Sequence, residues 1–154
     1  MRVTLVAVGR LKERHYRDAA QEYLKRLTPY ASVDVVEIAD RDVTRDESRA
    51  LAEEGSAILK ALPESAHVIL LEVAGHQHSS EEFAGWIQAG MLQGRSHLAF
   101  VIGGAAGLAP EVLFRADTRI SLGPMTLPHQ LARVVLLEQV YRAFRIMRNE
   151  PYHR

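Results

Sequence analysis

The chain has 154 residues, a length that fits one domain with a substantial core. Its 19 Lys and Arg residues balance 19 Asp and Glu residues, so the global charge points to neither a nucleic-acid nor a membrane partner. The absence of cysteine excludes disulfides, thiolate metal sites and cysteine nucleophiles, and it fits a reducing cytosol. The N-terminal apolar run is too short for a signal peptide, and no stretch is long enough to span a membrane. We therefore expect a cytoplasmic protein without a membrane partner.

Short apolar runs alternate with helical patterns along the chain. The runs predict strands at residues 3–8, 33–38, 67–73, 98–102 and 118–122. Apolar spacings of three and four, with glycine and proline breaks, predict helices at residues 15–27, 44–62, 79–94, 110–116 and 129–147. Thr44 with Glu47 and Ser79 with Glu82 are candidate capping boxes at two of the helix starts.

The third apolar run, from His67 to Val73, is continuous rather than alternating, as in strands that are covered on both faces. Alternating strands and helices of this kind predict a single α/β domain over residues 1–154, with a parallel sheet and helices on both faces. Ligands of such sheets bind beyond the carboxyl ends of the strands. The loops after Leu71, Ile102 and Leu122 are therefore the candidate site.

The turn after the fourth strand has the pattern Gly103-Gly104-x-x-Gly107. Glycine lets a backbone approach a ligand closely, although a tight turn alone also explains the residues. The pattern is neither the three-glycine dinucleotide fingerprint nor a phosphate loop. His76 and His78 resemble a pair of metal ligands, but no third ligand is evident, and we expect no metal.

The last third of the chain is the most distinctive. Gly123, Pro124 and Pro128 exclude regular structure before the final helix, which begins near His129. The positive end of the helix dipole there favours a neutral imidazole that can accept a proton, and a purely structural histidine is the alternative. The apolar stripe of this helix is wide enough for burial on two sides, one of them against a partner subunit. It comprises Leu131, Val134, Val135, Leu136, Leu137, Val140, Tyr141, Phe144 and Met147.

Four segments of the sequence together resemble one known family. They are Phe100-Val-Ile-Gly-Gly-x-x-Gly-Leu108, Met125-Thr-Leu-Pro-His-Gln-Leu-Ala-Arg133, Glu138-Gln-Val-Tyr-Arg-Ala143 and Pro151-Tyr-His-Arg154. The chain is similar, over essentially its whole length, to the RlmH family of SPOUT-class enzymes. These enzymes methylate N3 of a pseudouridine in bacterial 23S rRNA.

The resemblance implies S-adenosylmethionine as methyl donor, a homodimer, rRNA in the ribosome as substrate, and a trefoil knot at the carboxyl-terminal end of the fold. Its cofactor pocket implies eight positions here, namely Leu71, Gly103, Leu122, Gly123, Pro124, Met125, Thr126 and Leu127. The family commonly has serine at the position of Gly123, so a side-chain hydroxyl contact is not expected there.

Transfer to the imide N3 of pseudouridine requires the loss of a proton. His129 or His153 could take it, whereas Arg133, Arg142 and Arg154 are candidates for holding phosphate or the developing charge. Tyr152 is a candidate for stacking on the target base. Two alternatives are a non-catalytic ribosome-associated RNA-binding module and a SPOUT methyltransferase acting on tRNA.

Overall fold

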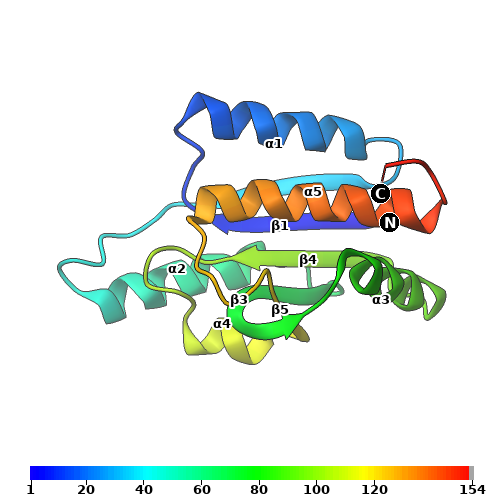
Figure 1. Cartoon of the computed structure of the whole chain (residues 1–154). Coiled ribbons are helices and arrows are strands. Elements are labelled where there is room, and N and C mark those ends of the chain that lie inside the picture. Colours follow the sequence, from blue (N-terminus) through cyan, green and yellow to red (C-terminus); the bar gives the residue numbers. More distant parts are fainter. Residues whose placement is uncertain (153–154) are drawn as a thin grey trace.

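The computed structural model describes residues 1–152 and shows a five-stranded sheet with helices on both faces (Figure 1). The strands are β1 (Arg2–Val8), β2 (Ser32–Ile38), β3 (His67–Gln77), β4 (His97–Ile102) and β5 (Thr118–Ser121). The helices are α1 (Arg14–Leu27), α2 (Glu47–Ala61), α3 (Ser80–Leu92), α4 (Pro110–Arg115) and α5 (His129–Met147).

The sheet has the strand order β2-β1-β4-β3-β5, and every neighbouring pair is parallel. This confirms the fold class that alternating apolar runs and helical patterns predict. Parallel neighbours bring the carboxyl ends of all five strands to one edge of the sheet. The loops after β3, β4 and β5 consequently meet there.

Two hydrophobic cores lie on opposite faces of the sheet. Alternate residues of β1 serve the two cores, because side chains of a strand point to opposite faces. Val3 and Leu5 pack in the core that α1, α3 and α5 cover, and Val6 and Val8 pack in the core beneath α2 and α4. Double coverage explains why the apolar runs of β1, β3 and β4 are continuous in the sequence.

The predicted start of α2 was wrong. The N-terminal cap is Asp46, whose carboxylate accepts a hydrogen bond from the Arg49 N–H at 3.0 Å. Thr44 cannot cap because Asp42 accepts hydrogen bonds from both its N–H and its hydroxyl in a local turn. The capping box predicted at Ser79 and Glu82 is confirmed at the start of α3.

Strand β3 continues past its predicted end at Val73 and pairs with β5 twice. Leu71 and His76 are both register partners of Ile120, and the intervening residues leave the ladder. Gly75 lies against the backbone of β5 so closely that a Cβ there would be 2.5 Å from the Ile120 carbonyl carbon. The segment was predicted to be a loop because it lacks an apolar run. Pairing of its backbone, rather than burial of its side chains, makes it a strand.

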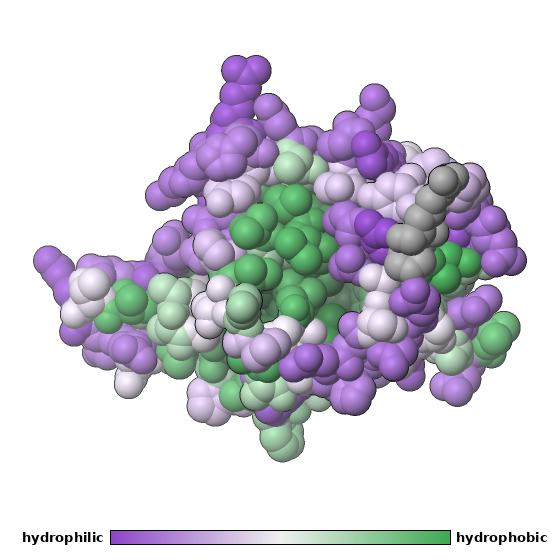
Figure 2. Space-filling view, viewed as in Figure 1, coloured by the Kyte–Doolittle hydropathy of each residue, from purple (hydrophilic) through white to green (hydrophobic). Residues whose placement is uncertain are grey.

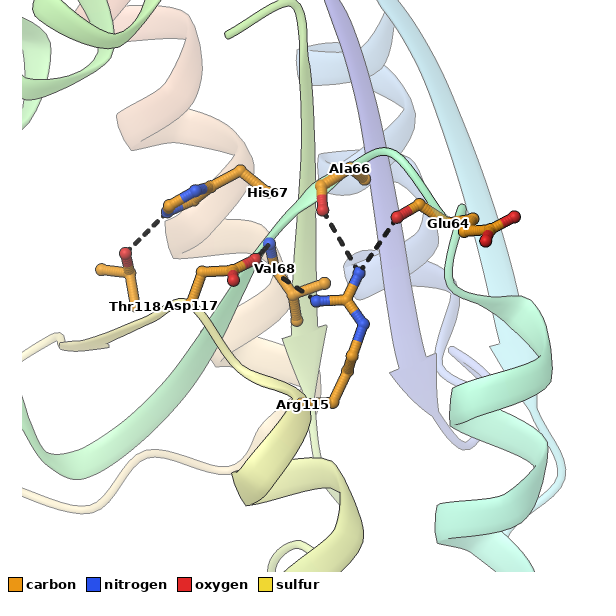
Figure 3. Close-up of polar contacts among 7 residues, drawn as sticks. All are labelled: Glu64, Ala66, His67, Val68, Arg115, Asp117 and Thr118. Carbon is orange, nitrogen blue, oxygen red and sulfur yellow. Dashed lines mark hydrogen bonds and ion pairs between the residues drawn. The ribbon is translucent and has the colours of Figure 1, made fainter.

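A polar cluster holds the amino ends of β3 and β5 together (Figure 3). The Asp117 carboxylate accepts a hydrogen bond from the buried Val68 N–H at 2.8 Å, and the Asp117 N–H donates to the Val68 carbonyl at 2.9 Å. Arg115 contacts the same carboxylate at 3.3 Å. The His67 ring nitrogen Nε2 is 2.7 Å from the Thr118 hydroxyl. β5 therefore begins at a fixed place on β3.

We expect the substitution Asp117→Ala to lower the free energy of unfolding by about 1–3 kcal/mol, because it leaves the buried Val68 N–H without an acceptor. Urea denaturation measures the change. Asp117→Asn is the matched control, since its amide oxygen can still accept from Val68, and it should lose less than half as much. Equal stability of Asp117→Ala and the parent protein would contradict the role given to this cluster.

Candidate functional site

A pocket of about 440 Å³ lies beyond the carboxyl ends of β3, β4 and β5. Its volume is within the range of pockets that enclose small-molecule ligands. Five segments form it: the part of β3 where the ladder is interrupted, the turn after β4, helix α4, the loop after β5 and the start of α5. Its lining consists of Leu71, Glu72, Val73, Ile102, Gly103, Gly104, Ala105, Gly107, Leu108, Leu113, Ser121, Leu122, Gly123, Met125, Thr126, Leu127, His129 and Ala132.

The turn after β4 forms one wall of this pocket and depends on glycine. Gly107 has a φ of +84°, and its N–H donates to the Gly104 carbonyl at 3.1 Å. A Cβ at Gly103 would lie 2.8 Å from the Gly107 carbonyl oxygen and 3.0 Å from the Leu108 side chain. The turn therefore closes only with glycine at position 103. The two interpretations of this motif are compatible, because the same tight turn faces the pocket.

The loop after β5 forms the opposite wall. The buried Ser121 hydroxyl accepts a hydrogen bond from the Gly123 N–H at 3.0 Å, which fixes the first bend of the loop. The apolar side chains of Leu122 and Met125 are 38% and 83% exposed. An apolar ligand face can bury them, so this wall suits a flat heterocycle.

The structure brings together seven of the eight predicted cofactor positions. These pocket-lining residues are Leu71, Gly103, Leu122, Gly123, Met125, Thr126 and Leu127. Pro124 lies in the same loop, is exposed and is not part of the lining. The predicted cofactor positions did not include Ser121, Leu108 or Leu113. Ser121 lies one residue before the end of the predicted strand at residues 118–122, next to the predicted site, which is the signal that would have identified it.

His129 is the predicted catalytic side chain that lines the pocket. It is the first residue of α5, and its Nε2 lies 3.6 Å from the position that a Cβ on Gly9 would occupy. The N-terminus of α5 follows Pro128 and has no side-chain cap. The imidazole therefore lies between the pocket and the end of β1, within reach of a bound ligand.

Arg133 lies one turn further along α5 and is buried, with 3% exposure. Its guanidinium donates to the Glu37 carboxylate at 2.6 Å and to the Gly9 carbonyl at 2.9 Å. These bonds brace the ends of β1 and β2 against α5. A contact of Arg133 with phosphate or with the developing charge stays a prediction, and these two bonds direct its guanidinium toward Glu37 and Gly9.

We expect Arg133→Met to lower the free energy of unfolding by about 1–3 kcal/mol, since it leaves a buried carbonyl and a partly exposed carboxylate without their donor. Glu37→Gln keeps an acceptor for the guanidinium and should cost less. Urea denaturation of both variants measures the difference. A fully stable Arg133→Met protein would show that the ion pair does not brace the strands.

A cluster near the C-terminal half of α5 consists of Glu138, Arg142 and Tyr152. Arg142 and Tyr152 are predicted catalytic residues, and Glu138 contacts both. The Glu138 carboxylate accepts hydrogen bonds from Arg142 Nε at 2.9 Å and from the Tyr152 hydroxyl at 3.1 Å. The Arg142 guanidinium lies 4.7 Å from the centre of the Tyr152 ring. Burial, reinforced by the Glu138 carboxylate, raises the pKa of Tyr152 to about 12. The phenol therefore stays protonated at neutral pH and is a hydrogen-bond donor rather than a base.

This cluster is distant from the pocket of its own chain. Glu138 lies nine residues beyond His129 on α5, which corresponds to about 14 Å along the helix axis. Glu138, Arg142 and Tyr152 are absent from the pocket lining, and His153 and Arg154 lie outside the described residues. Within one chain, the described structure does not join the predicted catalytic groups of the tail to the pocket.

A second hollow of about 350 Å³ shares Ser121, Leu122, Gly123 and Leu127 with the first. It lies between the end of β3, the start of α3 and the middle of α5. On its wall the Ser80 hydroxyl donates to the Gln139 side chain at 2.7 Å.

The imidazoles of His76 and His78 are 4.5 Å apart, and residues 1–152 contain no cluster of three side chains suited to holding a metal ion.

Comparison with known proteins identifies the family. A model described as "Predicted SPOUT methyltransferase" matches residues 1–153. The chain belongs to this family. Proteins named ribosomal RNA large subunit methyltransferase H are similar over the full length of both chains, with 50% identity in Carboxydothermus hydrogenoformans, 49% in Bifidobacterium animalis subsp. lactis and 48% in Listeria welshimeri.

Solved structures share this fold at low sequence identity. A probable methyltransferase from Bordetella pertussis is 14% identical, with a TM-score of 0.58 over 92% of this chain and 95% of the other. A probable methylase family protein from Haemophilus influenzae is 15% identical, with a TM-score of 0.57 over 99% of this chain and 70% of the other. Among residues 1–152, the helices of this family member are too short or too polar to cross a membrane.

Proposed function

We propose that this protein transfers a methyl group from S-adenosylmethionine to N3 of a pseudouridine in bacterial 23S rRNA, on the assembled ribosome in the cytoplasm. The observation that carries the proposal is the pocket at the carboxyl edge, formed by the segments whose sequence resembles the family's cofactor site. The names of the full-length relatives support large-subunit rRNA as the substrate. A non-catalytic RNA-binding module would not need such a pocket.

The chemistry of the pocket suits S-adenosylmethionine. Backbone groups of the loop from Leu122 to Leu127 can hydrogen-bond the edge of an adenine, and apolar side chains of the same loop can flank its faces. Gly103, Gly104 and Gly107 present only backbone at the pocket wall, which suits the close approach of ribose and of the methionine portion. The cofactor supplies an activated methyl group on a sulfonium.

The protein's part in the transfer is alignment and proton removal. In-line displacement on a sulfonium requires the acceptor nitrogen to be held on the axis of the breaking bond. The N3 proton must leave, and His129 is the basic side chain on the pocket wall. Its imidazole can accept the proton directly or through one water molecule.

The tail completes the site from a second subunit in this proposal. The apolar side chains of Leu131, Val134 and Val135 on α5 are partly exposed. Figure 2 shows an apolar patch over this helix, at the centre of the face. A homodimer that covers this patch can bring the Arg142 and Tyr152 cluster of one chain to the pocket of the other. The trefoil knot implied by the resemblance stays a prediction.

Replacement of Gly103 tests the cofactor pocket. Gly103→Ala places a Cβ against the Gly107 carbonyl, which displaces the pocket wall, and we expect S-adenosylmethionine affinity in calorimetric titration to fall by about 10-fold or more, equivalent to ~1.4 kcal/mol. Gly85→Ala on α3 is the matched control, because a Cβ there meets no atom within 4 Å. Unchanged affinity of a folded Gly103→Ala protein would refute the placement.

Deletion of residues 153–154 tests the tail without disturbing the contacts of Tyr152. S-adenosylmethionine affinity should stay within about 2-fold, whereas single-turnover methylation of ribosomes lacking the modification should fall by about 100-fold or more, as lost alignment and charge stabilisation predict. Equal rates would remove the catalytic role of the tail. A parallel loss of cofactor binding would place the tail in the cofactor pocket.

Mixing the two variants tests sharing between subunits. In a statistical mixture of Gly103→Ala and tail-deleted chains, half of the dimers contain one intact pocket opposite an intact tail, so about one quarter of the wild-type activity should return. A tail that serves its own pocket would give no rescue. Sedimentation of the wild-type protein as a stable monomer at micromolar concentration would contradict the dimer itself.

A further inference from the structure

A cationic segment lies between β1 and the first turn of α1. Residues 10–17 carry four cationic side chains, Arg10, Lys12, Arg14 and Arg17, against one carboxylate, in a chain whose net charge is zero. All four cations are exposed. We call residues 10–17 the basic segment. They give this part of the protein surface a strongly positive local charge.

The cations of the basic segment are weakly neutralised. Among residues 1–152, Arg10 and Lys12 have no carboxylate within ion-pairing distance. Arg14 is 3.5 Å from Asp18, but the two side chains are 87% and 69% exposed, so water screens the pair. Elsewhere the arginines near the pocket are paired, as Arg119 is with Glu72. The basic segment therefore presents weakly paired positive charge beside the end of β1.

Core packing and hydrogen bonds from two arginines hold the backbone of the basic segment in place. Leu11 is buried in the core, with 9% exposure. The Arg17 guanidinium donates to the Lys12 carbonyl at 2.9 Å, and the preceding Gly9 carbonyl is bound by Arg133. The exposed cations therefore project from a braced loop, which lowers the entropy lost when a ligand orders them.

The basic segment adjoins the candidate catalytic pocket. It follows Gly9 directly, and Gly9 neighbours the imidazole of His129 on the pocket wall. In the view of Figures 1 and 2, hydrophilic side chains cover α1 above the apolar patch on α5. A macromolecule whose reacting group enters the pocket therefore passes close to these cations.

An aromatic pair accompanies the charge. The rings of His15 and Tyr16 lie 4.3 Å apart, and His15 is exposed on the first turn of α1. Cations beside an exposed imidazole ring suit RNA, which offers phosphates and unstacked bases together. An acidic protein surface would engage the cations but would leave the rings unused.

We propose that the basic segment binds the phosphate backbone of the rRNA that flanks the target nucleotide, and thereby docks the substrate at the pocket. The inference rests on the proposed function and specifies which surface recognises the RNA. Each phosphate contact releases condensed counterions, so the contact contributes to affinity and makes it depend on salt. The segment acts on docking and does not take part in methyl transfer.

The test is the double variant Arg10→Glu/Lys12→Glu, compared with the wild-type homodimer. Its dissociation constant for ribosomes lacking the modification should rise by about 10-fold or more, and the slope of log affinity against log salt should shrink by about 1.5–2 for two lost contacts. The single-turnover methylation rate at saturating ribosomes and the S-adenosylmethionine affinity should stay unchanged. Unaltered ribosome affinity and salt slope would overturn the proposal.

The matched control is Lys25→Glu/Lys60→Glu, which changes net charge equally. Lys25 and Lys60 are exposed at the C-terminal ends of α1 and α2, at the opposite edge of the sheet. Equal weakening by both double variants would reduce the effect to overall charge and overturn the proposal. The same two double variants are also compared on deproteinised 23S rRNA. If Arg10→Glu/Lys12→Glu weakens binding to ribosomes more than the control does, but weakens binding to deproteinised rRNA no more than the control, the basic segment contacts a ribosomal protein instead of rRNA.

These readouts separate the inference from the proposed function. If the wild-type protein binds ribosomes but transfers no methyl group to them, the proposed function fails while the binding comparison can still be made. If the wild-type protein methylates ribosomes and the basic-segment variant docks as well as its control, only the inference fails.

Discussion

The backbone of β5 at Ile120 pairs with two separate parts of β3, and the position of the pocket depends on this contact. Gly75 permits the approach because a Cβ there would lie inside the β5 backbone. The residues between the two pairings leave the ladder, and two of them, Glu72 and Val73, line the pocket. The polar cluster around Asp117 fixes the other end of β5. The loop that follows Ser121 therefore starts from a strand held at both ends.

The pocket and the charged groups of α5 are organised by different forces. Backbone segments with glycine and small or apolar side chains shape the pocket, as expected for a site that encloses a heterocyclic ligand. The arginines of α5 are paired, Arg133 with Glu37 and Arg142 with Glu138, so their charges are held in fixed positions. A paired arginine can orient neighbouring groups but offers less charge to a substrate. The cations of residues 10–17, by contrast, are exposed and only weakly paired.

The difference between paired arginines and exposed cations matters for an RNA-modifying enzyme, which must both bind RNA and transfer a group to it. Docking needs exposed cations that trade counterions with phosphate, whereas transfer needs a small enclosed volume in which a few groups are aligned. In this fold the exposed cations and the pocket both lie at the carboxyl ends of the strands, because the parallel strands all end on that side of the sheet. The net charge of the chain is zero, although residues 10–17 are locally positive. Composition alone does not show this, because it does not record where the charges lie.

The sequence by itself determined the alternation of strands and helices, the parallel sheet and the strand-end loops that meet at the pocket. Local patterns carry these features, because continuous apolar runs require burial on both faces and glycine-rich turns follow the strands directly. Only the tertiary structure decided that residues after Val73 pair with β5, that Asp46 rather than Thr44 caps α2, and that Arg133 is buried against Glu37 and Gly9. Each of these outcomes depends on which partner a polar group meets, and those partners are set by packing between segments that are distant in the chain.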